Sequence, residues 1–199
     1  DQRATRRGVL VTSTPDMVTN ACAEYTLALM LACVRRLGEA EKMLEERIRA
    51  SPDDSGMQAR YGILNSRMGR PDKALVALET AVERDPTNFE ARAEYGFLLY
   101  RGGDPDKAMR VLNDVLSAEP RHALAVYYRG VVLFFKGEAK AAEDAFKSAT
   151  VLDPTLSTAF FSLGELYEKA GKKDDARKSY EAAAKLDHRE ATDALKKLK

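Results

Sequence analysis

The fold is decided by residues 86–120, which read PTNFEARAEYGFLLYRGGDPDKAMRVLNDVLSAEP. Pro86 and Pro120 bound this stretch, and prolines stand at the same 34-residue step on either side, at Pro52 and Pro154. Proline stops a helix because it lacks a backbone N–H and forces the preceding residue away from the helical conformation. An interval that recurs this regularly indicates an internal repeat.

Three further sets of residues keep the same step along the chain. They are Gly62, Gly96, Gly130 and Gly164; then Gly69, Gly103, Gly137 and Gly171; and then Ala74, Ala108, Ala142 and Ala176. We expect the first glycines to lie inside a helix and to let the next helix approach, with the alanines facing them. The second glycines are expected to end the first helix of each pair in the left-handed conformation. Asp104 and Pro105 then predict the cap and the first residue of the following helix.

With these residues in register, the chain resembles the tetratricopeptide-repeat (TPR) family, whose unit is a helix–turn–helix of 34 residues. The resemblance covers residues 55–190 and implies an all-α fold, a right-handed solenoid of antiparallel helix pairs. We expect repeats over residues 55–88, 89–122, 123–156 and 157–188, followed by a capping helix over residues 189–199. The helix pairs are expected at residues 55–68 and 71–84, 89–101 and 105–118, 123–136 and 139–152, and 157–170 and 173–186.

Residues 19–54 keep the phase of the repeats but lack their glycines. Ala28 and Arg35 stand where the two glycines of a repeat would lie. We therefore expect a degenerate repeat here, formed either by a helix pair or by one long helix. A short extended, non-helical segment is expected before it, over residues 1–18.

The helix expected at Leu27–Val34 is apolar on every side. Such a helix requires burial on several sides, and the neighbouring repeat covers only one of them. The remaining cover would be residues 1–18 folded back onto the helix or a second copy of the chain, and without either the helix would fray. Self-association through this helix is therefore one hypothesis for the chain.

The same part of the chain carries a second pattern, Gly8-Val-Leu-Val-Thr-Ser-Thr-Pro15 followed by Ala21-Cys-Ala-Glu24-Tyr-Thr-Leu-Ala28. Over residues 4–43 it resembles part of the D-isomer-specific 2-hydroxyacid dehydrogenases, in which this piece leads into the nucleotide-binding domain. The glycine-rich phosphate-binding motif of that domain is absent from the sequence. No catalytic residue of the family can be carried over, so the pattern implies an inactive fragment joined to the repeats.

Composition and charge argue against several classes of function. The formal net charge is +1, so no overall field attracts nucleic acid or an anionic membrane. No apolar run is long enough to cross a membrane, and Cys22 and Cys33 are too far apart along one helix for a disulfide. We therefore expect a cytoplasmic protein that neither inserts into membranes nor binds nucleic acid.

The sequence contains no set of residues with the spacing expected of a catalytic or metal-binding site. Its two histidines, His122 and His188, lie at repeat junctions, without cysteines, histidines or carboxylates at the spacing of a metal site. Carboxylate pairs such as Asp53-Asp54 fall on the first turns of expected helices, where they suit the helix dipole. We expect no catalytic, cofactor or metal site, and we do not expect an enzyme.

In TPR proteins the first helices of successive repeats line a concave face, and fixed positions of these helices point into it. The resemblance implies that the partner-binding groove consists of Ile63, Arg67, Phe97, Tyr100, Arg101, Tyr127, Val131, Phe134, Phe135, Phe161 and Glu165. Two interpretations of the phenylalanines stay open, because they belong either to the core between helices or to an exposed apolar stripe that marks a binding site. The set with which some TPR domains clamp a C-terminal carboxylate is not matched, since Ala59 and Ile63 replace its lysine and asparagine.

The leading hypothesis is a non-catalytic scaffold or adaptor that binds a peptide or an amphipathic helix of a partner protein in the concave groove. The alternative is a structural protein that forms homo-oligomers through the apolar N-terminal helix or through the groove. A remote alternative is an inactive fusion that contains a fragment of a 2-hydroxyacid dehydrogenase.

Overall fold

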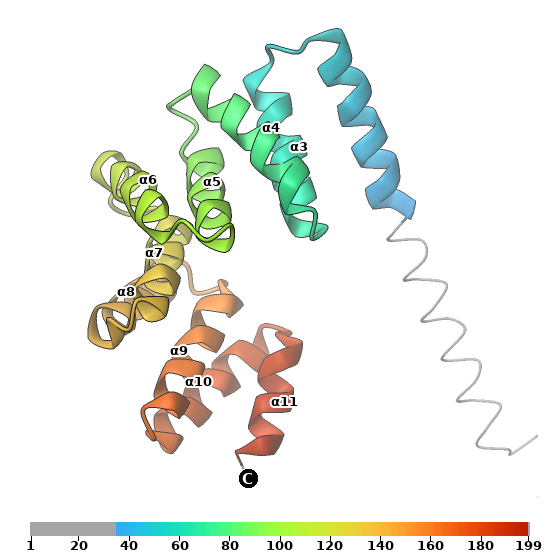
Figure 1. Cartoon of the computed structure of the whole chain (residues 1–199). Coiled ribbons are helices and arrows are strands. Elements are labelled where there is room, and N and C mark those ends of the chain that lie inside the picture. The colour runs from blue at the N-terminus through green and yellow to red at the C-terminus, as the bar shows by residue number, and fades with distance from the viewer. Residues whose placement is uncertain (1–34, 199) are drawn as a thin grey trace, which may run out of the picture. The chain divides into compact units, whose positions relative to one another are not determined.

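The computed structural model describes residues 35–198 (Figure 1). The chain divides into two compact units, Asp1–Arg47 and Ile48–Lys199. Residues 35–50 are helical, and this helix ends two residues before Pro52. The extended segment expected over residues 1–18, the earlier part of the degenerate repeat and the apolar helix Leu27–Val34 lie outside the described residues.

The second unit is a succession of antiparallel helix pairs. Its helices are α3 (Ser55–Arg67), α4 (Pro71–Arg84), α5 (Phe89–Arg101), α6 (Pro105–Ala118), α7 (Ala123–Phe135), α8 (Ala139–Leu152), α9 (Ser157–Lys169), α10 (Lys173–Lys185) and α11 (Arg189–Lys197). Each helix of the four pairs begins at the residue expected from the sequence and ends no more than one residue before the expected end. The capping helix α11 also begins where it is expected. Every regular element among the described residues is a helix, so the structure confirms the all-α fold class.

The helix ends are made by the residues that recur along the chain. Gly69, Gly103, Gly137 and Gly171 all have positive φ, between 71° and 91°. This confirms the expected left-handed closure, in which a residue without Cβ adopts a conformation that other residues avoid. At the start of α6 the Asp104 side chain accepts a hydrogen bond from the Lys107 N–H, and Pro105 is the first helical residue. His122 caps α7 in the same way through Nδ1, at 3.2 Å from the Ala125 nitrogen.

The glycines inside the first helices make room for large side chains of the second helices. A Cβ built on Gly164 would lie 2.5 Å from Cδ1 of Tyr180, and one built on Gly62 would lie 2.5 Å from Cγ of Leu78. The sequence pattern places the alanines opposite these glycines, and Ala74 does lie close to Gly62, since its carbonyl oxygen would be 3.2 Å from a Cβ built there. The closest atoms, however, belong to Leu78. The side chain one helical turn after the alanine fills the space, because residues four apart share a helix face.

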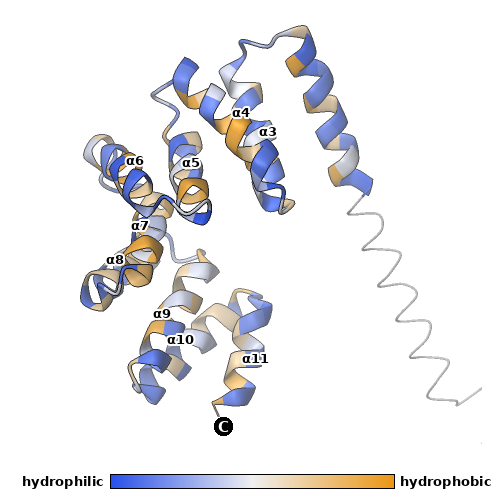
Figure 2. Cartoon of the chain, in the orientation of Figure 1, coloured by the Kyte–Doolittle hydropathy of each residue, from blue (hydrophilic) through white to orange (hydrophobic). Residues whose placement is uncertain are grey.

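Neighbouring repeats stack so that their first helices meet. Helix α3 contacts α5, α5 contacts α7, and α7 contacts α9, whereas no comparable contact joins α4, α6, α8 and α10 to one another within residues 35–198. The first helices therefore lie on the inner side of the stack (Figure 1). We call the surface formed by the solvent-facing sides of α3, α5, α7 and α9 the inner face. Both apolar and polar residues occur on every helix of the unit (Figure 2), and this is how a helix with one buried side is patterned.

Candidate partner-binding groove

The middle of the inner face carries a stripe of aromatic rings from α5 and α7. Phe97 stacks on Tyr128 with ring centroids 4.3 Å apart and an angle of 8° between the planes. Tyr100 meets Phe135 edge to face at 5.5 Å. Phe97 and Tyr100 are half-buried against the core, but Phe135 is 67% exposed. The stripe therefore packs against the core on one side and faces solvent on the other.

A second part of the stripe links α7 to α9. The Tyr127 hydroxyl lies 3.4 Å from the Ser162 hydroxyl, and burial raises the pKa of Tyr127 above its usual value. Val131 on α7 and Ile63 on α3 are half-buried and pack against the same core. Arg67 and Arg101 lie at the ends of their helices, where both are exposed. The apolar positions of the expected groove thus form one packed layer, and the arginines border it.

A buried carboxylate lies beneath this stripe. Glu94 on α5 is 6% exposed and accepts a hydrogen bond of 2.8 Å from the hydroxyl of Tyr128 on α7. Burial raises the pKa of Glu94, against the lowering effects of the Tyr128 hydrogen bond and of the Arg67 charge. The pKa of Tyr128 is raised far above its usual value by burial first and then by the negative charge of Glu94. This pair joins α5 and α7 through a buried polar contact.

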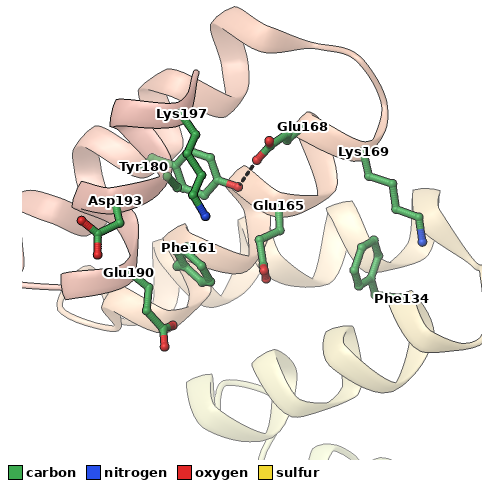
Figure 3. A pocket seen from close by; sticks show the side chains of 10 residues that line it. Phe134, Phe161, Glu165, Glu168, Lys169, Tyr180, Glu190, Asp193 and Lys197 are labelled. Atoms are coloured by element: carbon green, nitrogen blue, oxygen red, sulfur yellow. Dashed lines mark hydrogen bonds between the residues drawn. The ribbon is translucent and has the colours of Figure 1, made fainter. Parts of the chain in front are cut away.

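The stripe leads into a groove of about 750 Å³ at the C-terminal end of the unit. Four helices contribute to it, and Figure 3 shows the side chains that line it. They are Phe134 of α7, Phe161, Glu165, Glu168 and Lys169 of α9, Tyr180 of α10, and Glu190, Asp193, Ala194 and Lys197 of α11. We call this hollow the C-terminal groove.

Two aromatic rings form the apolar surface of the C-terminal groove. Phe161 stacks on His188 with centroids 4.5 Å apart and 15° between the planes, and it lies 5.5 Å from Tyr180. Phe134 has the ammonium group of Lys169 over its ring, 5.0 Å from the centroid. Both phenylalanines are partly buried against the core. This packing restrains the rings, so ordering them around a ligand would cost little entropy.

Only some carboxylates of the C-terminal groove have a hydrogen-bond partner among the described residues. The Tyr180 hydroxyl donates a 2.7 Å hydrogen bond to Oε2 of Glu168. Glu165 has no hydrogen bond or ion pair with any residue that the structure describes, and the same holds for Glu190. Partial burial raises the pKa of Glu165, and the nearby negative charges of Glu190 and Glu168 raise it further. A carboxylate that lies close to other negative charges is stabilised by a nearby cation.

The structure brings three of the expected groove residues into this one hollow, namely Phe134, Phe161 and Glu165. The others lie along α3, α5 and α7, where they form the aromatic stripe or its border. Phe134 and Phe161 pack on the core and also line the groove, and the interpretation of the phenylalanines as a binding site stays a prediction. Phe135 points to solvent instead.

Sequence reasoning missed the contribution of α10 and α11 to this hollow. Four residues of the helix expected only as a cap, Glu190, Asp193, Ala194 and Lys197, line the C-terminal groove. Their spacing of three, four and seven residues from Glu190 places them on one face of a helix, and this signal was available in the sequence. Tyr180 reaches the groove because it crosses over Gly164.

No helix of residues 35–198 is long and apolar enough to span a membrane. No group of three or more histidine, cysteine, aspartate or glutamate side chains there is placed to hold a metal ion.

Comparison with protein-family models identifies the repeats. Two models described as tetratricopeptide repeat match the chain, one over residues 66–127 and the other over residues 157–190. Both matches fall within the stretch in which prolines and glycines recur every 34 residues. They confirm the resemblance inferred from that recurrence.

Solved structures share this fold. A thermophilic TPR protein of Thermus thermophilus is 25% identical, with a TM-score of 0.71 over 87% of this chain and 95% of that one. MamA of Desulfovibrio magneticus RS-1 is 24% identical, with a TM-score of 0.57 over 85% of this chain and 96% of that one. PilF of Pseudomonas aeruginosa is 18% identical, with a TM-score of 0.62 over 82% of this chain and 75% of that one. At these identities the likeness to MamA and PilF concerns the fold alone.

The curated relatives match a short stretch. A glyoxylate reductase of Thermococcus gammatolerans is 55% identical over 40 residues, 20% of this chain and 12% of the enzyme. One of Thermofilum pendens is 51% identical over 41 residues, 21% of this chain and 12% of the enzyme. The chain thus spans about 12% of the length of these relatives. These matches bear out a partial resemblance to dehydrogenases and show no enzymatic function.

Proposed function

The chain is a tetratricopeptide-repeat protein, and from that premise we propose that it is a non-catalytic scaffold that binds a segment of a partner protein on its inner face. The observation that carries the proposal is the continuous surface formed by the aromatic stripe and the C-terminal groove. Phe97, Tyr127, Phe134 and Phe161 are half-buried there, so each offers a ring edge or face to a ligand while its position is held by the core.

The chemistry of this surface suits an amphipathic segment. Aromatic side chains bury a large area with few rotatable bonds, and they commonly anchor protein interfaces. A helix laid in a groove is recognised by apolar residues three and four apart, whose polar faces stay in solvent. Here the apolar stripe has arginines at one end, Arg67 and Arg101, and carboxylates at the other, Glu165 and Glu168. Such a distribution selects the direction as well as the identity of a bound segment.

The proposal is tested by selecting ligands for the full chain from a displayed library of random peptides of about 16 residues, which span roughly 24 Å as a helix. We expect enriched peptides to bind the wild-type chain and to lose about tenfold or more in affinity with Phe134→Ala or Phe161→Ala. Val151→Ala is the matched control, because Val151 is 79% exposed on α8, outside the inner face.

Thermal unfolding of each variant shows whether weaker binding results from a lost contact or from an unfolded chain. The proposal is wrong if no peptide is enriched, or if folded Phe134→Ala and Phe161→Ala variants bind the enriched peptides as the wild type does. It is supported if both variants bind weakly while Val151→Ala binds normally.

A further inference from the structure

Phe161 lies between two carboxylates that the chain leaves without a counter-charge. Figure 3 shows Glu190 on one side of the ring and Glu165 on the other. Neither carboxylate has a hydrogen bond or ion pair within residues 35–198. Their negative charges are close enough for Glu190 to raise the pKa of Glu165. Both carboxylates are exposed, so water screens their repulsion in part, and a cation bound between them would be attracted by both.

Some other carboxylates of the repeats form hydrogen bonds within the chain. Tyr180 donates a hydrogen bond to Glu168, and Lys147 donates one to Glu143. Glu165 lies one helical turn before Glu168 on α9, in the same groove, and has no such partner among the described residues. Exposed carboxylates elsewhere, such as Glu119, also have no partner among the described residues, so what distinguishes Glu165 and Glu190 is their place beside Phe161 in the groove.

The two phenylalanine rings of the C-terminal groove differ in whether a cation of the chain lies over them. The ring of Phe134 already has a cation of the chain over it, Lys169. No lysine or arginine among the described residues lies over Phe161, whose stacking partner is His188. The lining residues carry four carboxylates, Glu165, Glu168, Glu190 and Asp193, against two ammonium groups, Lys169 and Lys197. An aromatic ring, two unpaired carboxylates and an excess of negative charge thus meet in one hollow.

We infer that the C-terminal groove takes an arginine side chain of the partner segment, with its guanidinium beside Phe161 and between Glu165 and Glu190. An apolar residue of the same segment packs against Phe134. This inference rests on the proposed function, and it names the chemical feature by which the groove selects its partner.

Arginine fits this place better than lysine does. Its guanidinium is planar and lies flat against an aromatic ring, and its N–H groups point outward in the plane toward carboxylates on either side. It is also more weakly hydrated than an ammonium group, so its transfer into a partly enclosed groove costs less. Hydrogen bonds between guanidinium and carboxylate are charge-assisted and therefore among the stronger ones.

The test uses the peptides selected on the full chain. We expect them to share an arginine at a fixed distance from an apolar residue. The best peptide is then prepared with arginine, with lysine and with citrulline, the neutral analogue of the same shape, and its affinity is measured by fluorescence anisotropy. Replacement of arginine by citrulline should weaken binding about tenfold, and replacement by lysine should weaken it by a smaller factor.

Variants of the chain test the contribution of the two carboxylates. Glu165→Gln and Glu190→Gln should each weaken binding of the arginine peptide by a clearly larger factor than binding of the neutral citrulline peptide. Glu119→Gln is the control, since Glu119 is an exposed glutamate at the end of α6 and does not line the groove. Glutamine keeps the size of the side chain, and thermal unfolding verifies that the variants fold.

The outcomes separate the inference from the proposed function. Enriched peptides that need Phe161 but lack arginine, or that bind equally with citrulline, overturn the inference and leave the proposed function standing. Arginine selectivity that survives in both Glu165→Gln and Glu190→Gln overturns the inference as well. If no peptide is enriched at all, the proposed function is wrong and the inference falls with it.

Discussion

The hydroxyl of Tyr128 donates a 2.8 Å hydrogen bond to Glu94, a residue that stands 34 positions earlier in the chain. The bond therefore joins equivalent turns of α5 and α7, one repeat apart, beneath the aromatic stripe of the inner face. Tyr128 also supports the stripe directly, because Phe97 stacks on its ring. One side chain thus couples the stacking of the repeats to the surface proposed to bind a partner.

Removal of this hydroxyl should destabilise the fold. We expect Tyr128→Phe to lower the free energy of unfolding by about 1–3 kcal/mol, because a buried carboxylate loses its donor. Urea denaturation near neutral pH measures the change. Tyr95→Phe serves as the control, since the Tyr95 hydroxyl bonds to the exposed Glu79, where water replaces it. Equal effects of the two substitutions would contradict this account of Glu94.

The buried carboxylate should also make stability depend on pH. Because the pKa of Glu94 is raised in the folded state, the folded chain keeps this proton at pH values where the unfolded chain has lost it. The contribution of Glu94 to the free energy of unfolding should therefore rise as pH falls from neutral toward the ordinary carboxyl pKa of about 4.3. Glu94→Gln should remove this contribution, so the stability of the variant should depend less on pH than that of the wild type. Denaturation of the wild type and of Glu94→Gln across this pH range, with Glu119→Gln as control, tests whether the contribution of Glu94 rises as the pH falls.

The contact between Gly164 and Tyr180 predicts a steric effect. Gly164→Ala places a Cβ 2.5 Å from the ring of Tyr180, which is almost fully buried and has no room to withdraw. We expect a loss of about 1–3 kcal/mol in the free energy of unfolding. Gly38→Ala, in the helix of residues 35–50, meets no atom within 4 Å and should stabilise that helix by roughly 0.5–1 kcal/mol. A neutral effect at Gly164 would contradict the close packing of α9 and α10.

Binding of an arginine peptide should weaken as the solution becomes acidic. The raised pKa of Glu165 means that it loses its charge at a higher pH than an ordinary carboxyl group. The charged or titratable groups around it are Tyr127 on α7, Glu168 and Lys169 on α9, Tyr180 on α10, Glu190, Asp193 and Lys197 on α11, and His188, which stacks on Phe161. Anisotropy titrations between about pH 7.5 and about pH 5 should show a falling affinity for the arginine peptide. The citrulline peptide should show little change, and parallel curves for the two peptides would contradict the assignment.

The mass of the chain in solution distinguishes partner binding from self-assembly. A chain whose inner face is reserved for another protein should have the mass of a monomer at every concentration. Light scattering over a dilution series of the full chain measures this. A mass that rises with concentration would instead favour homo-oligomers through the inner face or through Leu27–Val34.

The helices could be predicted closely because their ends depend on neighbours in the sequence. Pro86, Gly103 and Asp104 act within one turn of their own positions, through a missing N–H, a positive φ and a side-chain cap. The groove could be predicted only in part, since its walls come from residues far apart in the chain. Phe134 and Phe135 look alike in the sequence, yet one lines the C-terminal groove and the other points to solvent.

By itself, then, the sequence determined the repeat, the helix pairs and the position of each turn, because these follow from backbone conformation and from the periodicity of apolar residues. Tertiary structure alone decided that Tyr180 fills the space over Gly164 and that α11 forms one wall of the C-terminal groove. It also left Glu165 and Glu190 beside Phe161 without a counter-charge from the described residues. These arrangements depend on how packed helices orient their side chains toward one another, and local sequence does not encode that relation.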